Sequence, residues 1–333
     1  MSGVYVIAEA GVNHNGKLDL ALRLVDIAAE ARADAVKFQT FRAERLATAS
    51  APLADYQRRA GEVDRQFEML RRLELSEESH RLVAERCRER GIAFLSSPFD
   101  EASADFLAPL VDRFKIPSGE VTNHRLLRHV ARYGKPMIVS TGMTTLGEVE
   151  RALDVITETG PVAVTLLHCT SLYPAPPGTV NLRAMNTLAA AFGVPVGFSD
   201  HTQGLAVAFA AIARGATVLE KHFSLDRKLP GPDHAASLEP GELCALVQGV
   251  RQIEIALGDG RKRPAPGERE MALTARRSLV IARDSVAGTV LRPELLDSRR
   301  PGTGISPDQV PLVVGRVLRR DLKAGSVIQW EDL

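Results

Sequence analysis

The chain has few of the features that mark secreted, membrane-bound or nucleic-acid-binding proteins. Its three cysteines, Cys87, Cys169 and Cys244, are widely spaced and form no CxxC pair. A disulfide framework is therefore not expected, and a reducing cytoplasm fits best. The formal net charge is only +1, which argues against a nucleic-acid surface or an electrostatic membrane anchor. No apolar run approaches the ~18 residues of a membrane span, and no basic-then-apolar signal pattern opens the chain.

What the sequence does contain is a recurring pattern of eight short apolar runs, each ending in polar residues. The runs cover residues 5–8, 35–36, 92–95, 114–116, 137–139, 164–167, 196–198 and 217–219. Stretches with apolar residues at helical spacing follow most of them, as Leu18, Leu22 and Val25 follow the first. Short buried strands that alternate with helices indicate parallel βαβ units, and eight units predict a (β/α)₈ barrel. The active site of such a barrel lies at the C-terminal ends of its strands, where these polar residues stand.

The length of 333 residues leaves room for a barrel of ~250 residues and a smaller second unit. We expect the barrel over residues 1–260, a Gly- and Pro-rich linker over 261–275 and a β-rich domain over 276–333. Residues 283–296 align with 320–333, so the last domain should consist of two related halves. The long segment between Gln39 and Ile92 should hold more than one helix, and its first part, through Arg65, is polar and Arg-rich. Such a loop at the catalytic end of a barrel is expected to form a lid or wall of the site.

Two histidines suggest a metal site. His201 and His222 follow the seventh and eighth runs, so the two imidazoles should lie at adjacent strand ends. Two histidine ligands with open positions suit a borderline divalent ion that also holds water and substrate oxygen. Glu9, at the end of the first strand, would add a carboxylate directly or through water. The alternative is a pair of unrelated strand-end histidines.

Lysines in apolar runs suggest an anion site. Lys37, Lys115 and Lys221 lie in or at the end of buried runs, where a charge is costly unless another group answers it. Lys37 and Lys115 could cradle a phosphate or carboxylate with the serines around the barrel mouth, which are Ser97, Ser118, Ser140 and Ser199. Each lysine could instead pair with a buried carboxylate, such as Glu9, Glu120 or Glu220. A third alternative makes Lys115 a Schiff-base lysine.

Other candidates are weaker by themselves. Cys169 is either a nucleophile or, more simply, a small buried residue. Tyr173 would hydrogen-bond a polar substrate or pack under the neighbouring prolines. Asp233 and His234 stand in a rigid loop after the eighth strand, which is also compatible with an ordinary turn. The basic pair before Pro301 has the composition of a solvated surface loop.

Several strings taken together resemble the N-acetylneuraminate (sialic acid) synthase family. They are residues 7–16 (IAEAGVNHNG), 36–40 (VKFQT), 97–99 (SPF), 115–120 (KIPSGE), 140–143 (STGM), 167–170 (LHCT), 173–174 (YP), 199–202 (SDHT), 220–223 (EKHF), 230–233 (PGPD) and 300–304 (RPGTG). The match spans nearly the whole chain in the family's order. The last domain resembles the antifreeze-like (SAF) domain of that family.

The resemblance implies an enzyme, a carbon–carbon bond-forming transferase. Phosphoenolpyruvate would condense with the open-chain aldehyde of N-acetylmannosamine to give a nine-carbon 2-keto acid, with phosphate leaving by C–O cleavage. It implies a divalent ion, Mn²⁺ or Mg²⁺, on His201 and His222. The implied catalytic residues are Glu9, Lys37, Lys115 and Arg300. The implied substrate-binding residues are Gln39, Ser97, Phe99, Ser118, Glu120, Ser140, Ser171, Tyr173, Ser199 and Asp233.

The resemblance also implies a homodimer in which the SAF domain is swapped and Arg300 enters the partner's site. One departure concerns the sugar: sialic acid synthases have Cys-Thr-Asn where this chain has Cys169, Thr170 and Ser171. A shorter hydroxyl leaves more space, which suits the 2,4-diacetamido-trideoxyhexose of a legionaminic or pseudaminic acid synthase. One substitution does not outweigh the resemblance as a whole, so we expect an N-acetylneuraminate synthase. The alternative product is legionaminic or pseudaminic acid. A Schiff-base aldolase and a binding protein without activity are further alternatives.

Overall fold

The protein divides into two compact units, Met1–Gly258 and Asp259–Leu333. The computed structural model describes residues 3–54, 57–58, 65–158 and 160–333. Within these ranges no helix is both long enough and apolar enough to cross a lipid bilayer.

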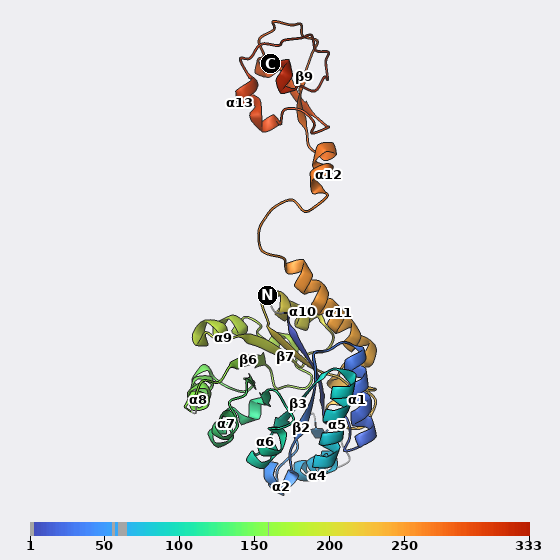
Figure 1. Ribbon diagram of the computed structural model, residues 1–333, viewed down its shortest axis with the longest axis vertical. Helices are drawn as coiled ribbons and strands as arrows, with labels where there is room; N and C mark the ends of the chain where they lie inside the picture. The colour runs from blue at the N-terminus through green and yellow to red at the C-terminus, as the bar shows by residue number, and fades with distance from the viewer. Residues whose placement is uncertain (1–2, 55–56, 59–64, 159) are drawn as a thin grey trace. The chain divides into compact units, whose positions relative to one another are not determined.

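The first unit is built on eight parallel strands (Figure 1). Their order in the sheet is β3-β2-β1-β8-β7-β6-β5-β4. β3 and β4, at the two ends of this order, lie against each other, so the sheet curves into a barrel. The bounds are β1 (Tyr5–Gly11), β2 (Ala35–Thr40), β3 (Ala93–Pro98), β4 (Phe114–Ile116), β5 (Met137–Ser140), β6 (Val164–Cys169), β7 (Val196–Asp200) and β8 (Val218–His222). The (β/α)₈ barrel predicted from the eight apolar runs is confirmed.

Helices follow the strands and surround them (Figure 1). Local sequence sets several of their ends. The hydroxyl of Ser76 accepts a hydrogen bond from the Ser79 N–H at the start of α5, and Gly91 ends that helix in the left-handed conformation. The helices of this unit are α1 (Leu18–Glu30), α2 (Ala43–Leu46), α4 (Gln66–Leu73), α5 (Glu77–Arg90), α6 (Glu101–Leu107), α7 (His124–Ala131), α8 (Leu146–Thr157), α9 (Ala184–Phe192), α10 (Ala206–Ala213) and α11 (Pro240–Leu257).

The interior of the barrel has an apolar layer with a polar layer above it. The apolar layer is formed by Ile7, Ala35, Leu95, Ile138, Leu167 and Val218. Gly197 joins it from β7, where a Cβ would lie only 2.7 Å from Leu167 Cδ2. Alternate residues of a strand share a face, so the next inward positions lie two residues further along. These positions hold Glu9, Lys37, Ser97, Ser140, Cys169 and Glu220.

Most strands extend further at their C-terminal ends than the apolar runs predict, although β4 coincides with its run. β1, for example, continues past Ala8 to Gly11, so that Glu9 lies inside the strand. An apolar run ends at the first polar residue, so it indicates only the apolar part of a strand. In a barrel the inward residues near the C-terminal end line a cavity, and polar side chains are favoured there.

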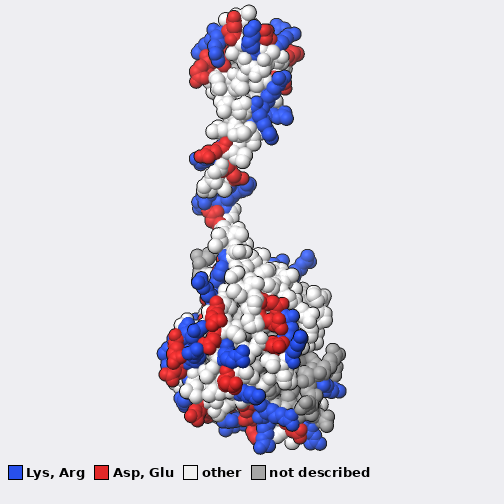
Figure 2. All heavy atoms as spheres, turned by 90° about the vertical axis from the view of Figure 1, so that its right-hand side faces the viewer, with Lys and Arg blue, Asp and Glu red and all other residues white. Residues whose placement is uncertain are grey.

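Ion pairs connect neighbouring helices on the outside of the barrel. Arg86 of α5 binds Asp26 of α1 at 2.8 Å, and Arg90 binds Glu30 at 3.1 Å. The face drawn in Figure 2 shows basic and acidic side chains interspersed over this unit, in keeping with the net charge of +1.

The second unit has its own core and an internal symmetry. β9 (Ser278–Ile281) and β10 (Leu296–Arg299) pair antiparallel, and Ile281, Leu291, Leu318 and Ile328 are among the core residues. The hydrogen bond from the Gly288 N–H to the Leu318 carbonyl has its counterpart from the Gly325 N–H to the Ile281 carbonyl, both 2.7 Å long. Each partner in the second bond is the repeat-equivalent of one in the first. The two sequence halves are thus related by an approximate two-fold.

The range expected as a linker, 261–275, contains a helix. α12 (Glu268–Ala275) occupies its second half, and α13 (Val310–Val313) lies further along in the same unit. The Glu268 carboxylate accepts a hydrogen bond of 2.6 Å from the Ala265 N–H just before the first turn. None of the residues of α12 is buried. The apolar periodicity that reveals a helix in sequence is therefore missing.

Candidate active site

A cavity of about 500 Å³ opens at the C-terminal ends of the strands. Most side chains that the sequence singled out in the barrel line it. They are Glu9, Lys37, Gln39, Phe99, Lys115, Ser118, Glu120, Ser140, Ser171, Tyr173, Ser199, His201 and His222. Ser97 and Asp233 lie beside lining residues, since Ser97 contacts Lys37 and Asp233 contacts His222.

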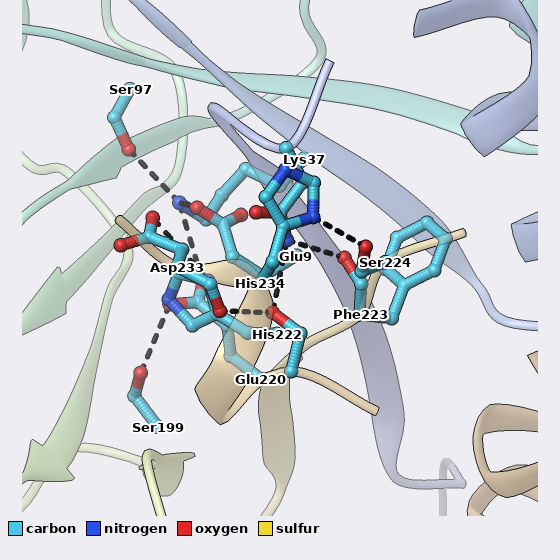
Figure 3. Close-up of polar contacts among 12 residues, drawn as sticks. Glu9, Lys37, Ser97, Ser199, Glu220, His222, Phe223, Ser224, Asp233 and His234 are labelled. Carbon is cyan, nitrogen blue, oxygen red and sulfur yellow. Dashed lines mark hydrogen bonds and ion pairs between the residues drawn. The ribbon is translucent and has the colours of Figure 1, made fainter. Parts of the chain in front are cut away.

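Four buried charges from four strands form the floor of this cavity. Lys37 Nζ lies 2.9 Å from Glu9 Oε1 and 3.9 Å from Glu220 Oε2. Lys115 Nζ lies 3.3 Å from Glu220 Oε1. The two ammonium groups thus form ion pairs with two carboxylates, and the formal charge of the cluster is zero. Figure 3 shows Lys37 and Glu9 beside each other, with the Ser97 hydroxyl at 3.3 Å from the ammonium.

The two carboxyl groups differ in their protonation. Burial raises the pKa of Glu9 to about 7, against the opposing charge of Lys37. Glu220 is also buried, but it faces both Lys115 and Lys37, which outweigh burial and hold its pKa at about 2. Burial lowers the pKa of Lys115, opposed by Glu220. One permanent anion and one group that titrates near neutrality therefore share the same two lysines.

The two histidines lie at one side of the same cavity. Their ring centroids are 5.4 Å apart, and the Tyr173 ring lies 4.2 Å from that of His201. His201 Nδ1–H donates to the Thr170 carbonyl at 2.7 Å, which leaves Nε2 with its lone pair. Burial lowers the pKa of His201 and, together with His201, lowers that of His222 well below its usual range. Both rings are therefore neutral, as metal ligation requires.

The surroundings of these histidines supply further polar atoms. His222 Nδ1 is buried and makes no hydrogen bond to the described residues, with Asp233 Oδ2 at 3.8 Å. Burial raises the pKa of Asp233 to about 6. No group of three or more His, Cys, Asp or Glu side chains within the described ranges has the arrangement of a complete metal site. The described residues thus bring together two neutral imidazoles on one side of the cavity.

Other residues named from the sequence lie elsewhere. Lys221, between Glu220 and His222, points to the opposite face of β8, where its ammonium lies 2.7 Å from Asp200. This lysine is a structural pair, not part of the cradle. His234 contacts Ser224 at 2.6 Å and Asn15 at 3.2 Å, which holds it in the loop after β8.

The structure adds lining residues that the sequence did not identify individually. Leu46, Ala54, Gln57, Gln66 and Leu70 come from the long segment after β2 and form part of the cavity wall. This segment was expected as a lid or wall, and part of it (55–56 and 59–64) lies outside the described residues. Glu220 had been considered only as a structural partner for a lysine. Its spacing of two residues from His222 on the same strand is the signal that places both in the cavity.

Arg300 belongs to the second unit, where its side chain is exposed. Its neighbour Arg299 binds Asp297 at 3.0 Å. For Arg300, no ion pair with another described residue is found. Arg299 therefore forms an ion pair within the second unit, whereas Arg300 forms none with the described residues.

Residues 24–262 match the model of the NeuB family, and residues 276–333 match the SAF domain. The chain belongs to the NeuB family. It is 49% identical over 335 residues to an N,N'-diacetyllegionaminic acid synthase of Legionella pneumophila, covering 99% of this chain and 94% of that protein. It is 44% identical to the synthase of the same name from Campylobacter jejuni, covering 99% and 100% of the two chains.

A solved structure gives the same family. The crystal structure of an N-acetylneuraminic acid synthetase from Leptospira borgpetersenii in complex with citrate has a TM-score of 0.72 and 35% identity, and the match covers 81% of this chain and 90% of that one. The resemblance to the sialic acid synthase family is confirmed. As a NeuB family member the chain is an enzyme, a transferase that forms carbon–carbon bonds, and the family uses phosphoenolpyruvate and amino sugars.

Proposed function

We propose that this NeuB family member is an N,N'-diacetyllegionaminic acid synthase. It would condense phosphoenolpyruvate with 2,4-diacetamido-2,4,6-trideoxymannose. The observation that carries the proposal is the 49% identity to a synthase of that name over nearly the full length of both chains. The sequence alone favoured N-acetylneuraminate as the product. The comparisons favour the alternative, because the N-acetylneuraminic acid synthetase structure is only 35% identical.

The anion half of the cavity suits phosphoenolpyruvate. Lys37 and Lys115 are buried ammonium groups, and buried cations bind carboxylate and phosphate far more strongly than exposed ones. The Ser140 hydroxyl is buried and makes no hydrogen bond to the described residues, so it is available to a ligand. Ser97, Ser118 and Ser199 complete the donors around the two lysines.

Glu9 is placed to act on water. Its carboxyl contacts Lys37 at 2.9 Å, and a pKa of about 7 suits a general base at neutral pH. In the proposed reaction, C3 of phosphoenolpyruvate attacks the aldehyde carbon, and the aldehyde oxygen gains a proton. Water adds to C2 and gives its proton to Glu9. The bond between C2 and the phosphate oxygen then breaks, the C2 hydroxyl becomes the ketone, and its proton leaves with inorganic phosphate. The proton that Glu9 accepts balances the proton taken up by the aldehyde oxygen.

His201 and His222 would hold a divalent ion, Mn²⁺ or Mg²⁺. The neutral rings, the free Nε2 of His201 and the buried Nδ1 of His222 without a hydrogen-bond partner support this assignment. When bound, such an ion polarises the aldehyde oxygen of the sugar as a Lewis acid. Tyr173, whose ring lies against that of His201, and Asp233, beside His222, would orient the sugar at this side of the cavity. Gln39, Phe99 and Glu120 would contribute from the rest of the lining.

We further propose that the enzyme acts as a homodimer and that Arg300 completes the cavity of a second copy. The support is that Arg300 is exposed and lacks an ion pair with the described residues, whereas Arg299 is paired. Complementation tests this directly. Arg300→Ala and Lys115→Met should each be inactive, and mixing the two variants under subunit exchange should restore activity, because some sites then receive both wild-type residues. No recovery in a demonstrated heterodimer contradicts the proposal.

Phosphate release separates the candidate substrates. The enzyme is incubated with phosphoenolpyruvate, Mn²⁺ and either the diacetamido sugar, its stereoisomers or N-acetylmannosamine. The highest kcat/KM is expected for 2,4-diacetamido-2,4,6-trideoxymannose. No phosphate release with any of these sugars would refute the assignment. Borohydride trapping with pyruvate provides a separate check, because a Schiff-base lysine at position 115 would be trapped and the proposed mechanism predicts no adduct.

A further inference from the structure

A second cavity of about 620 Å³ lies at the same end of the barrel, beside the first. It is lined by the loop after β5, the start of α8, the end of β6 and the start of α9. We call it the lateral cavity. None of the two lysines, the two histidines or Glu9 of the active-site cavity lines it.

Three residues, Met143, Cys169 and Ser171, line both cavities. The wall between the two spaces is therefore one side chain thick at this point. Gly142 stands directly behind it, where a Cβ would lie 2.3 Å from Ser171 Oγ and 2.7 Å from Cys169 Sγ. Met143 is 74% exposed, so no packed core holds its side chain on the outer side. The small Ser171 and the exposed Met143 stand where the two cavities meet, and we refer to this point as the passage between them.

The lateral cavity is suited to a neutral group with both apolar and polar atoms. Leu146, Val149 and Leu188 supply apolar surface, and several threonine side chains supply hydroxyl groups. Arg183 is the only Lys, Arg, Asp or Glu residue among its described lining, and it is exposed. His168 is occupied, because its Nε2–H donates to the Val180 carbonyl at 2.6 Å.

We infer that the lateral cavity holds the second N-acyl group of the sugar, and that Ser171 and Met143 determine specificity by admitting it. The inference rests on the proposed function. A sugar whose aldehyde lies at the two histidines extends along Tyr173, and Ser171 lies two residues earlier in the same loop. An acetamido group presents a methyl to apolar surface and an amide to hydroxyls, which matches the lining. N-acetylmannosamine has no second acetamido group and gains nothing from this cavity.

Three variants test the inference through the preference of the enzyme for the diacetamido sugar over N-acetylmannosamine. Ser171→Asn narrows the passage with a longer side chain, and Thr187→Tyr fills the lateral cavity from its exposed outer side on α9. Ala189→Tyr is the matched control, since Ala189 is exposed on the same helix and does not line the cavity. The quantity measured is kcat/KM for the diacetamido sugar divided by kcat/KM for N-acetylmannosamine, at saturating phosphoenolpyruvate and Mn²⁺.

Ser171→Asn and Thr187→Tyr are each expected to lower this ratio by about tenfold or more, the size of effect that filling a substituent pocket produces. Ala189→Tyr should leave it unchanged. An unchanged ratio in Thr187→Tyr with normal circular dichroism overturns the inference, whatever the effect on either sugar alone. So does a wild-type preference for N-acetylmannosamine 6-phosphate that Arg183→Ala removes, because the cavity would then hold a phosphate. Wild-type enzyme that turns over neither sugar refutes the proposed function first, and the inference with it.

Discussion

Replacing Glu220 by glutamine should weaken the fold and strengthen anion binding at the same time. Glu220 lies 3.3 Å from Lys115 and 3.9 Å from Lys37, and it is 4% exposed. At an effective dielectric constant of ~20 these contacts correspond to about 5 and about 4 kcal/mol of gross Coulomb energy. Desolvation offsets much of this. Measurements on buried clusters indicate that removing one partner costs about 3–5 kcal/mol of unfolding free energy.

The same substitution leaves two ammonium groups facing a single carboxyl. An incoming phosphate then no longer competes with Glu220 for Lys115, so its affinity should rise by at least ~5-fold, on the order of 1 kcal/mol. The melting temperature should fall by about 6–20 °C, at ~2–4 °C per kcal/mol for a domain of this size. Added phosphate should recover more of that loss in the variant than in the wild type, because tighter binding stabilises the native state more.

Melting is best followed by far-ultraviolet circular dichroism. Most helices belong to the barrel, whereas the single tryptophan, Trp330, lies in the second unit and reports on that unit. Phosphate affinity is measured by calorimetry. The matched control is Asp200→Asn, which breaks a buried pair of 2.7 Å with Lys221 outside the cavity. It should lose stability without gaining phosphate affinity. If both variants bind phosphate like the wild type, Glu220 does not compete with the substrate anion and the reasoning fails.

Three further predictions concern the same cavity. Because burial raises the pKa of Glu9 to about 7 and a general base works only when ionised, kcat/KM should rise about tenfold per pH unit below pH 7 and level off above it. A pH–rate profile checks this, and Glu9→Gln should abolish the limb. His201→Ala should weaken Mn²⁺ binding by at least ~10-fold in equilibrium dialysis; unchanged binding would contradict the two-histidine assignment. A Cβ at position 142 would lie 2.3 Å from Ser171 Oγ, so Gly142→Val should displace Ser171 and lower the free energy of unfolding by about 1–3 kcal/mol in a denaturant titration. An unchanged free energy of unfolding would show that Ser171 moves aside without cost.

The sequence was sufficient for the barrel and for most of the cavity lining. Each apolar run marks one strand, and strand ends meet in a closed barrel, so Lys37 and His222 could be placed together without coordinates. The face of the strand on which each side chain lies was harder to predict from the sequence. Lys221 is as buried as Lys37 and looked equivalent, yet it faces the other way because its neighbours Glu220 and His222 face the cavity.

Features that depend on three-dimensional surroundings could not be read from residue order. Helix α12 has no buried residue and carries no apolar periodicity. The lateral cavity is lined in part by the loop after β5 and the start of α9. No sequence motif indicates that these two segments lie next to each other. Glu220 was weighed only as a pairing partner because its distance to two lysines at once depends on the closure of the barrel.

The four-charge cluster has a consequence for how the barrel folds. Its members come from the first, second, fourth and eighth strands, and Glu9 and Glu220 are separated by most of the chain. A partly assembled sheet leaves these groups in water, and the pairing of β1 with β8, the first and last strands of the barrel in the sequence, brings Glu9 and Glu220 together. The barrier to folding should therefore include the dehydration of two ammonium and two carboxyl groups in one step. Recovery of activity during refolding would then report on this pairing, because the groups that it brings together line the candidate active site.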